Sequence, residues 1–179
     1  MSLGPWLYII ALAVIVALWQ SQSVRPQTSG PTDSGGDIVA PANAARIADG
    51  DSIDVGRLRM RLDGIDAPEL VQQCTDASGR AFDCGQTSAR ALADLVRDKA
   101  LRCVRHGVDQ FGRILAVCSA DGVDVNAAMV DSGNAVAYRG DYLAYVPNEE
   151  RAKAAKKGLW AGSFTMPRDY RRDAGRRPQ

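Results

Sequence analysis

Residues 48–70, ADGDSIDVGRLRMRLDGIDAPEL, decide the fold of this chain and carry most of its candidate chemistry. In the segment RLRMRL (57–62), arginines alternate strictly with Leu58, Met60 and Leu62. Successive side chains of a β-strand point to opposite faces, so this alternation predicts a strand with one apolar face and one arginine-bearing face. We therefore expect the strand to be half buried.

Acidic residues cluster on the turns at both ends of this strand. Asp49 and Asp51 precede it, and Asp66 and Glu69 follow it. Clustered carboxylates beside arginines suit a hard divalent cation that holds a phosphate, because Ca²⁺ and Mg²⁺ prefer oxygen ligands and a guanidinium matches two phosphate oxygens. The alternative is that the two Asp-Gly pairs (49–50 and 63–64) form ordinary hairpin turns with solvated acids.

The remaining patterns outline the rest of the fold. Residues 38–47 and 52–55 predict a first hairpin that turns at 49–50, residues 100–105 and 113–119 predict a second, and an apolar stripe predicts a helix over 86–97. Asp124 and Asn148 are candidate N-caps of two further helices, which end at Gly133 and Gly158. Short strands interrupted by a helix favour a small Greek-key barrel with helices packed on it.

Composition narrows the chemistry. The chain has 179 residues, 22 Lys and Arg against 21 Asp and Glu, and a net charge of +1, so any attraction to phosphate must be local. His106 is the single histidine, which argues against His-centred zinc sites and Ser-His-Asp relays, and we expect it to be a surface residue without a catalytic role. A hydrolase with this composition has to act through carboxylates, arginines and a metal.

The four cysteines favour two disulfides. If the second hairpin turns over residues 109–112, Cys103 and Cys118 are symmetric about its centre and face each other across the ladder. Cross-strand neighbours lie about 4.5 to 5.5 Å apart at Cα, which a disulfide accepts. Cys74 and Cys84 then close a short loop of their own. The alternative is four reduced, buried cysteines.

Both ends of the chain look like appendages to one domain. Residues 1–19 contain an uncharged apolar run from Leu3 to Trp19, either a signal-peptide core or a short membrane anchor, and the missing basic n-region favours the anchor. Residues 20–37 have the composition of a flexible tether. The cysteines suggest that the domain faces an oxidising, extracytoplasmic side, periplasmic or extracellular, whether anchored or secreted. The arginine-rich tail, residues 163–179, could touch nucleic acid or anionic lipid, but a disordered solubilising end is favoured.

Three motifs in order resemble the thermonuclease (micrococcal nuclease) family: residues 48–70, the segment DQFGR (109–113) and the segment VNAAMV (125–130). The similarity covers about residues 40–162. It implies an α+β, mainly β domain over residues 38–162, with a five-stranded OB-type Greek-key barrel and about three packed helices. It also implies Ca²⁺-dependent hydrolysis of phosphodiester bonds in DNA or RNA with little sequence specificity. No protein partner is implied.

The resemblance assigns roles to residues that match the family pattern. It implies Ca²⁺ ligands at the Asp51 and Asp66 carboxylates and the Ala67 backbone carbonyl, with Asp49 as an acid behind them. The general base falls on Glu69 and the two phosphate-binding arginines on Arg61 and Arg113. The substrate-binding aromatic rings fall on Tyr138 and Phe111. One departure is that Gln110-Phe111 stands where the family usually has Lys-Tyr, which removes a hydroxyl and a positive charge from the nucleotide pocket.

Two functional classes follow from these residues. The first is a secreted or membrane-tethered nuclease that uses Ca²⁺ as its cofactor. The second is a non-catalytic OB-type module that binds nucleic acid or a partner protein. Because the acids and both arginines are retained, the sequence favours the enzyme.

Overall fold

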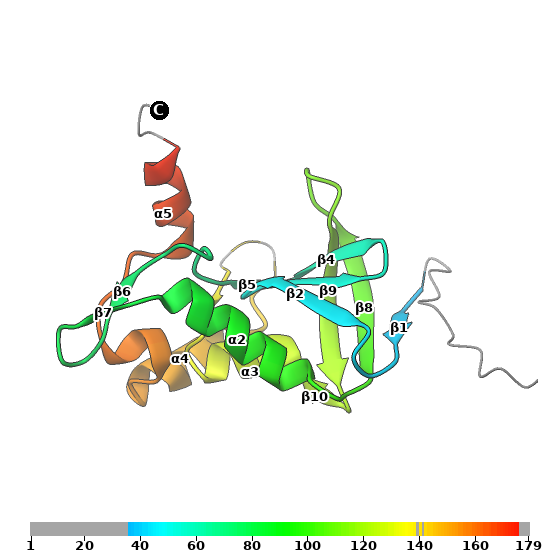
Figure 1. Ribbon diagram of the computed structural model, residues 1–179, viewed down its shortest axis with the longest axis horizontal. Coiled ribbons are helices and arrows are strands. Elements are labelled where there is room, and N and C mark those ends of the chain that lie inside the picture. Colours follow the sequence, from blue (N-terminus) through cyan, green and yellow to red (C-terminus); the bar gives the residue numbers. More distant parts are fainter. Residues whose placement is uncertain (1–35, 139, 141, 176–179) are drawn as a thin grey trace, which may run out of the picture.

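A computed structural model describes residues 36–138, 140 and 142–175 of the chain. The protein has an α+β fold dominated by one mixed sheet, in which the strands run in the order β1-β8-β9-β4-β3-β2 (Figure 1). The short strand β10 pairs with the C-terminal end of β9. The strands of this sheet are β1 (Ile38–Ala40), β2 (Ala45–Asp49), β3 (Ser52–Val55), β4 (Leu58–Leu62), β8 (Leu101–Val108), β9 (Ile114–Ala120) and β10 (Val123–Asp124). The expected α+β, mainly β class is confirmed.

Helices and two small strand pairs complete the described part of the chain. The helices are α2 (Cys84–Val96), α3 (Val125–Asp131), α4 (Val146–Ala154), the 3₁₀ helix η1 (Gly158–Ala161) and α5 (Pro167–Ala174). The strand pairs are β5 (Ile65–Asp66) with β11 (Val136–Ala137), and β6 (Cys74–Thr75) with β7 (Ala81–Phe82). Figure 1 shows α5 and the β8–β9 turn rising beyond the same side of the sheet.

The central strand β4 has the predicted two faces. Met60 and Leu62 are buried, whereas Arg59 is exposed and Arg61 is half-buried. β4 pairs antiparallel with β3 and parallel with β9, so it connects the first hairpin, β2–β3, to the second, β8–β9. The two-residue alternation therefore sends the apolar side chains to the core and leaves the arginines on the face that carries the acids.

Both predicted disulfides are confirmed. Cys103 and Cys118 are register partners in the β8–β9 hairpin and are fully buried, and Cys74 is bonded to Cys84. The described part of the chain has no free cysteine.

Three details of the expected fold are wrong. Asn148 lies inside α4, whose N-cap is Tyr145 with Pro147 in the first turn. That helix also ends at Ala154 rather than at Gly158, which begins η1. Residues 38–40 do not belong to the first hairpin, because they form β1 and pair with β8. In contrast, the Asp124 carboxylate accepts a hydrogen bond from the Ala127 N–H, as an N-cap of α3 should.

The expected disorder of the C-terminal stretch is also wrong for residues 167–174, which form α5. The sequence of this helix carries helix signals, namely Pro167 and Asp169 in the first turn and arginines in the last turn. Because the helix is polar, tertiary contacts supply most of its stabilisation. Nothing among the described residues is both helical and apolar over a length that could cross a membrane. The apolar run at 3–19, nearly all of the tether and residues 176–179 lie outside the described residues.

Candidate active site

A cavity of about 850 Å³ opens on the arginine-bearing face of β4. Its walls come from the turn after β2, from β4 and the segment up to residue 69, from the β8–β9 turn, from the end of β11 and from α5. The sequence-predicted residues that line it are Asp49, Asp51, Arg61, Ala67, Glu69, Phe111, Arg113 and Tyr138. Asp66 lies behind this wall, where it contacts two of the lining arginines. The structure thus brings all the predicted site residues together.

Asp51 is a buried acid on the floor of the cavity. Its Oδ1 accepts hydrogen bonds from Arg61 (2.9 Å) and Ser52 (3.1 Å), and its Oδ2 accepts one from the Ala67 N–H (3.0 Å). Burial raises the pKa of Asp51 to about 7, and the nearby Arg61 only partly opposes this shift. Asp49 adds negative charge and also accepts the Asp51 N–H. This acid is therefore poorly compensated, and a bound cation would stabilise its ionised form.

Asp66 joins two arginines that lie far apart in the sequence. Its Oδ1 accepts from Arg61 at 2.7 Å and from Arg171 at 3.0 Å, and its Oδ2 accepts a second bond from Arg171 at 3.0 Å. Asp66 is 2 % exposed, so its carboxylate is shielded from water, and the two arginines that contact it hold its orientation.

Glu69 stands at the mouth of the same cavity. Its Oε1 accepts a hydrogen bond from Arg171 at 2.8 Å, and its side chain is 38 % exposed. Oε2 has no hydrogen-bond partner in the described part of the chain. Glu69 therefore has one oxygen held by a guanidinium and one available to a water molecule.

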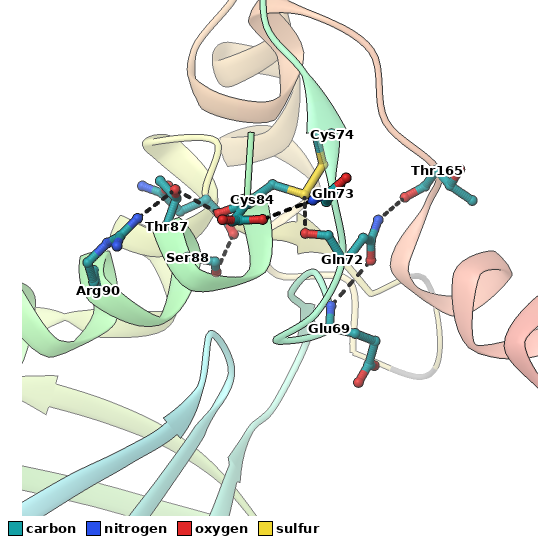
Figure 2. The surroundings of a disulfide bond; sticks show 11 residues. Glu69, Gln72, Gln73, Cys74, Cys84, Thr87, Ser88, Arg90 and Thr165 are labelled. Carbon is teal, nitrogen blue, oxygen red and sulfur yellow. Dashed lines mark hydrogen bonds between the residues drawn. A yellow bond between two sulfur atoms is a disulfide. The ribbon is translucent and has the colours of Figure 1, made fainter. Parts of the chain in front are cut away.

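The backbone of Glu69 is held by a buried glutamine. The Gln72 Oε1 accepts the Glu69 N–H at 3.2 Å, and the Gln72 Nε2 donates to the Thr165 carbonyl at 2.7 Å (Figure 2). The Gln72 N–H in turn donates to the Glu69 carbonyl at 2.7 Å. Gly85 packs so closely that a Cβ there would lie 1.8 Å from the Glu69 carbonyl oxygen.

The donor set fits a hard divalent cation. Across the described ranges, no three His, Cys, Asp or Glu side chains are grouped so that they alone could hold an ion. Two buried carboxylates, Asp51 and Asp66, and the adjacent Ala67 carbonyl are oxygen donors, which suit Ca²⁺ or Mg²⁺ when water and substrate phosphate complete the coordination. Among the described residues, each carboxylate accepts three hydrogen bonds of about four possible, so each keeps capacity for an ion.

The lining of the cavity also includes a guanidinium and two aromatic rings. The Arg113 Nε donates to Asp109 Oδ2 at 2.7 Å, which fixes the side chain at the base of the β8–β9 turn. The Phe111 ring lies 5.5 Å from the Arg113 guanidinium and is 73 % exposed, and Tyr138 is 48 % exposed. Exposed rings beside a cation are suited to stacking nucleobases. His106, in contrast, contacts Asp63 at 2.8 Å and does not line the cavity.

Sequence reasoning missed two residues of this site. Arg171 was expected in a disordered tail, and Gln72 was not singled out. The helix signals around Pro167 could have placed Arg171 on a helix, but not against Asp66, because that contact spans 105 residues. No local signal distinguishes Gln72 from its neighbour Gln73.

Known proteins resemble this chain in sequence. The family model described as staphylococcal nuclease homologue matches residues 59–162. An uncharacterised endonuclease of Haemophilus influenzae is 36% identical over 136 residues, which cover 71% of this chain and 70% of the relative. A micrococcal nuclease of Shigella flexneri is also 36% identical, over 65% of this chain and 71% of the relative. The succinoglycan biosynthesis protein ExoI of Rhizobium meliloti is 40% identical over 65% of this chain, and the matched stretch spans 62% of that relative.

Proposed function

Because this chain belongs to the staphylococcal nuclease homologue family, we propose that it hydrolyses phosphodiester bonds in DNA or RNA, with Ca²⁺ as its cofactor and little sequence preference. The observation that supports this most strongly is the shared cavity. Two buried acids, a half-exposed glutamate and two arginines gather around one space large enough for a nucleotide. Contacts to phosphate and stacking on rings carry no base code, which is why weak sequence preference is proposed.

Asp51, Asp66 and the Ala67 carbonyl would hold the cation. When bound, the cation supplies positive charge at the non-bridging oxygens of the phosphate and lowers the repulsion that an attacking water meets. Hydrolysis also needs a base, and Glu69 Oε2 is the oxygen free to accept the proton of that water.

The two arginines would bind the phosphate from either side. Arg61 uses one terminal nitrogen on Asp51 and the other on Asp66, and a guanidinium has five N–H donors, so three remain for phosphate oxygens. Arg113 donates from Nε to Asp109, which leaves both terminal nitrogens for the substrate. Charge stabilisation of this kind typically contributes about 3 to 4 kcal/mol per donor.

A direct assay tests the proposal. Purified protein is incubated with plasmid DNA or RNA and with Ca²⁺, Mg²⁺, Mn²⁺ or a chelator, and cleavage is followed on gels. We expect cleavage with Ca²⁺, and we expect Asp51→Asn to lose activity that partly returns at high Ca²⁺. Protein that binds nucleic acid but cuts none with any of these ions would instead be a non-catalytic binding module.

We also propose that the domain works outside the cytoplasm, either secreted or tethered by residues 3–19. Two disulfides in one small domain support this, because cytoplasmic thiols are kept reduced. Peptide mapping of protein from its native compartment should find both disulfides, and sequencing of the mature N-terminus should distinguish an anchor from a cleaved signal. Four free thiols would contradict the proposal.

A further inference from the structure

The C-terminal helix α5 reaches the candidate active site from outside the segment that matches the family. That match ends at residue 162, whereas α5 spans Pro167–Ala174. One side chain of α5, Arg171, lines the cavity. It donates from one terminal nitrogen to both Asp66 and Glu69, and from the other to Asp66.

The segment that leads into α5 is fixed to the loop that carries Glu69. Ser163 and Thr75 exchange two backbone hydrogen bonds of 2.9 Å each, next to the Cys74–Cys84 disulfide. Two residues later, the Thr165 carbonyl accepts from the fully buried Gln72, whose other side-chain atom holds the Glu69 N–H (Figure 2). The Glu69 loop and α5 are therefore one connected unit.

The apolar residues before α5 anchor this unit. Phe164 and Met166 pack against a second, smaller core that contains Cys74, Cys84 and Leu159. Because backbone, glutamine and apolar contacts all converge there, the start of α5 has a defined place. These contacts consequently fix the helix that places the Arg171 guanidinium next to the acids.

Arg171 partly compensates the negative charge of the acids in the cavity. Among the described residues, Arg61 contacts Asp51 and Asp66, and Arg171 contacts Asp66 and Glu69. Without Arg171, the Glu69 carboxylate would lose the only hydrogen-bond partner it has in the described part of the chain, and Asp66 would keep Arg61 alone. A carboxylate without a partner samples several rotamers, and catalysis depends on a base held in one place.

We propose that Arg171 is a positioning residue of the active site, which holds Glu69 through Oε1 so that Oε2 faces the attacking water, and which fixes Asp66 for the cation. This inference rests on the proposed nuclease function. It extends the active site to a helix that the family match does not include. The occupied Oε1 and free Oε2 are what a positioned base requires, since the guanidinium orients the carboxylate without taking the oxygen that accepts the proton.

The experiment compares Arg171→Gln and Arg171→Lys with the matched control Arg172→Gln in the full chain. Arg172 lies on the same helix but is 56 % exposed and pairs with Asp169. At saturating Ca²⁺ and with nucleic acid as substrate, we expect Arg171→Gln to lower kcat by about tenfold or more, as loss of such supporting partners usually does, with KM nearly unchanged. Arg171→Lys should recover only part of the rate, because one ammonium cannot bind two carboxylates as a planar fork does. Arg172→Gln should match wild type.

A second readout does not depend on activity. Backbone hydrogen exchange of residues 67–73 should be faster in Arg171→Gln than in wild type, and unchanged in Arg172→Gln. Arg171 variants that keep wild-type kcat and wild-type exchange would overturn the proposal. Variants that cut faster than wild type at low Ca²⁺ would also overturn it, because Arg171 would then be a competitor of the cation. If wild type cuts no nucleic acid, the proposed function fails, and the exchange measurement still decides whether Arg171 holds the Glu69 loop.

Discussion

At the scale of single residues, several interactions in this site share a small number of carboxylate oxygens. Arg61 bonds to Asp51 and Asp66, and Arg171 bonds to Asp66 and Glu69, so the few oxygens that form the internal ion pairs would, under the proposed function, also serve a cation and a water. The ionised form of Asp51 is disfavoured in this arrangement, because burial raises the pKa of Asp51 to about 7. Residues with the same charge consequently have different roles, and substitutions should separate those roles.

Substitution of Glu69 tests the proposed base. Glu69→Gln is nearly isosteric and leaves Asp51 and Asp66 intact, so the variant should fold and bind Ca²⁺ like wild type. We expect its rate to fall by about a hundredfold or more, because an amide cannot accept the proton. Steady-state kinetics and calorimetric Ca²⁺ titration measure the two effects, with Glu150→Gln on the exposed side of α4 as the control. A Glu69→Gln enzyme with wild-type kcat would show that another group is the base.

Substitution of Arg113 tests phosphate binding by a guanidinium. Arg113→Lys keeps the charge but loses both the Nε contact to Asp109 and the paired donors. We expect activity to fall by about a hundredfold. Arg151→Lys, on an exposed arginine of α4 that pairs with Asp131, should retain full activity. Equal kinetics for Arg113→Lys and wild type would mean that charge alone suffices at this position.

At the scale of elements, the short aperiodic segments are as well defined as the sheet. The loop after β5 is held by Gln72, by the Cys74–Cys84 disulfide and by the start of α2. The loop between β6 and β7 is closed by Asp76, which accepts from Ser78 and from the Arg80 N–H. The first of these loops places Glu69 at the cavity.

The start of α2 should control the Glu69 loop. Gly85→Ala puts a Cβ 1.8 Å from the Glu69 carbonyl oxygen, so the loop has to move. We expect lower thermal stability and a lower kcat together. Gly107→Ala is the control, because nothing lies within 4 Å of a Cβ there. If Gly85→Ala kept wild-type kcat, the position of the Glu69 backbone would not matter to the rate.

The β6–β7 loop should give a measurable pH dependence. Hydrogen bonds, of which the largest contribution comes from Ser78, lower the pKa of Asp76 from 3.8 to about 2. A lowered pKa means that the ionised acid stabilises the fold above about pH 4, and that this contribution is lost as the pH falls to about 2. We therefore expect Asp76→Asn to be less stable than wild type at pH 6, with the difference vanishing near pH 2. Denaturant midpoints across this range check it, and a difference that grew on acidification would contradict the assignment.

At the scale of the whole molecule, two disulfides stabilise two different cores. Cys103–Cys118 lies inside the main core under β8 and β9, away from the cavity. Cys74–Cys84 lies in the second core, beside Gln72 and the segment that enters α5. We therefore expect the two bridges to have comparable effects on stability and different effects on the site.

Paired substitutions should separate these effects. Removal of either disulfide by double replacement with serine should cost on the order of 2 to 4 kcal/mol of unfolding free energy. Only the Cys74/Cys84 double variant should also lose kcat under conditions in which both variants are folded, since it loosens the Glu69 loop. Denaturant unfolding and kinetics measure both. Equal loss of kcat in the two double variants would show that the site responds to global stability alone.

The sequence alone determined the parts of this protein that depend on neighbours along the chain. The alternation in 57–62 predicted the two faces of β4, the symmetry about the centre of the 109–112 turn predicted the Cys103–Cys118 pair, and Asp124 was recognisable as an N-cap. Strand periodicity, hairpin register and helix capping are local rules, so a linear pattern carries them. The acids and arginines of the cavity were recognised because three motifs kept the order of a known family.

Only the tertiary structure decided what joins residues far apart. The contact between Arg171 and Asp66 spans 105 residues, and the bond from Gln72 to Thr165 spans 93. Neither produces a periodicity or a turn signal, because the free energy comes from burial and charge pairing that exist only after the chain has folded. The helix α5 is polar and arginine-rich, a composition that suggests disorder. It is ordered because Arg171 pairs with acids of the cavity and because the residues before the helix pack against the second core.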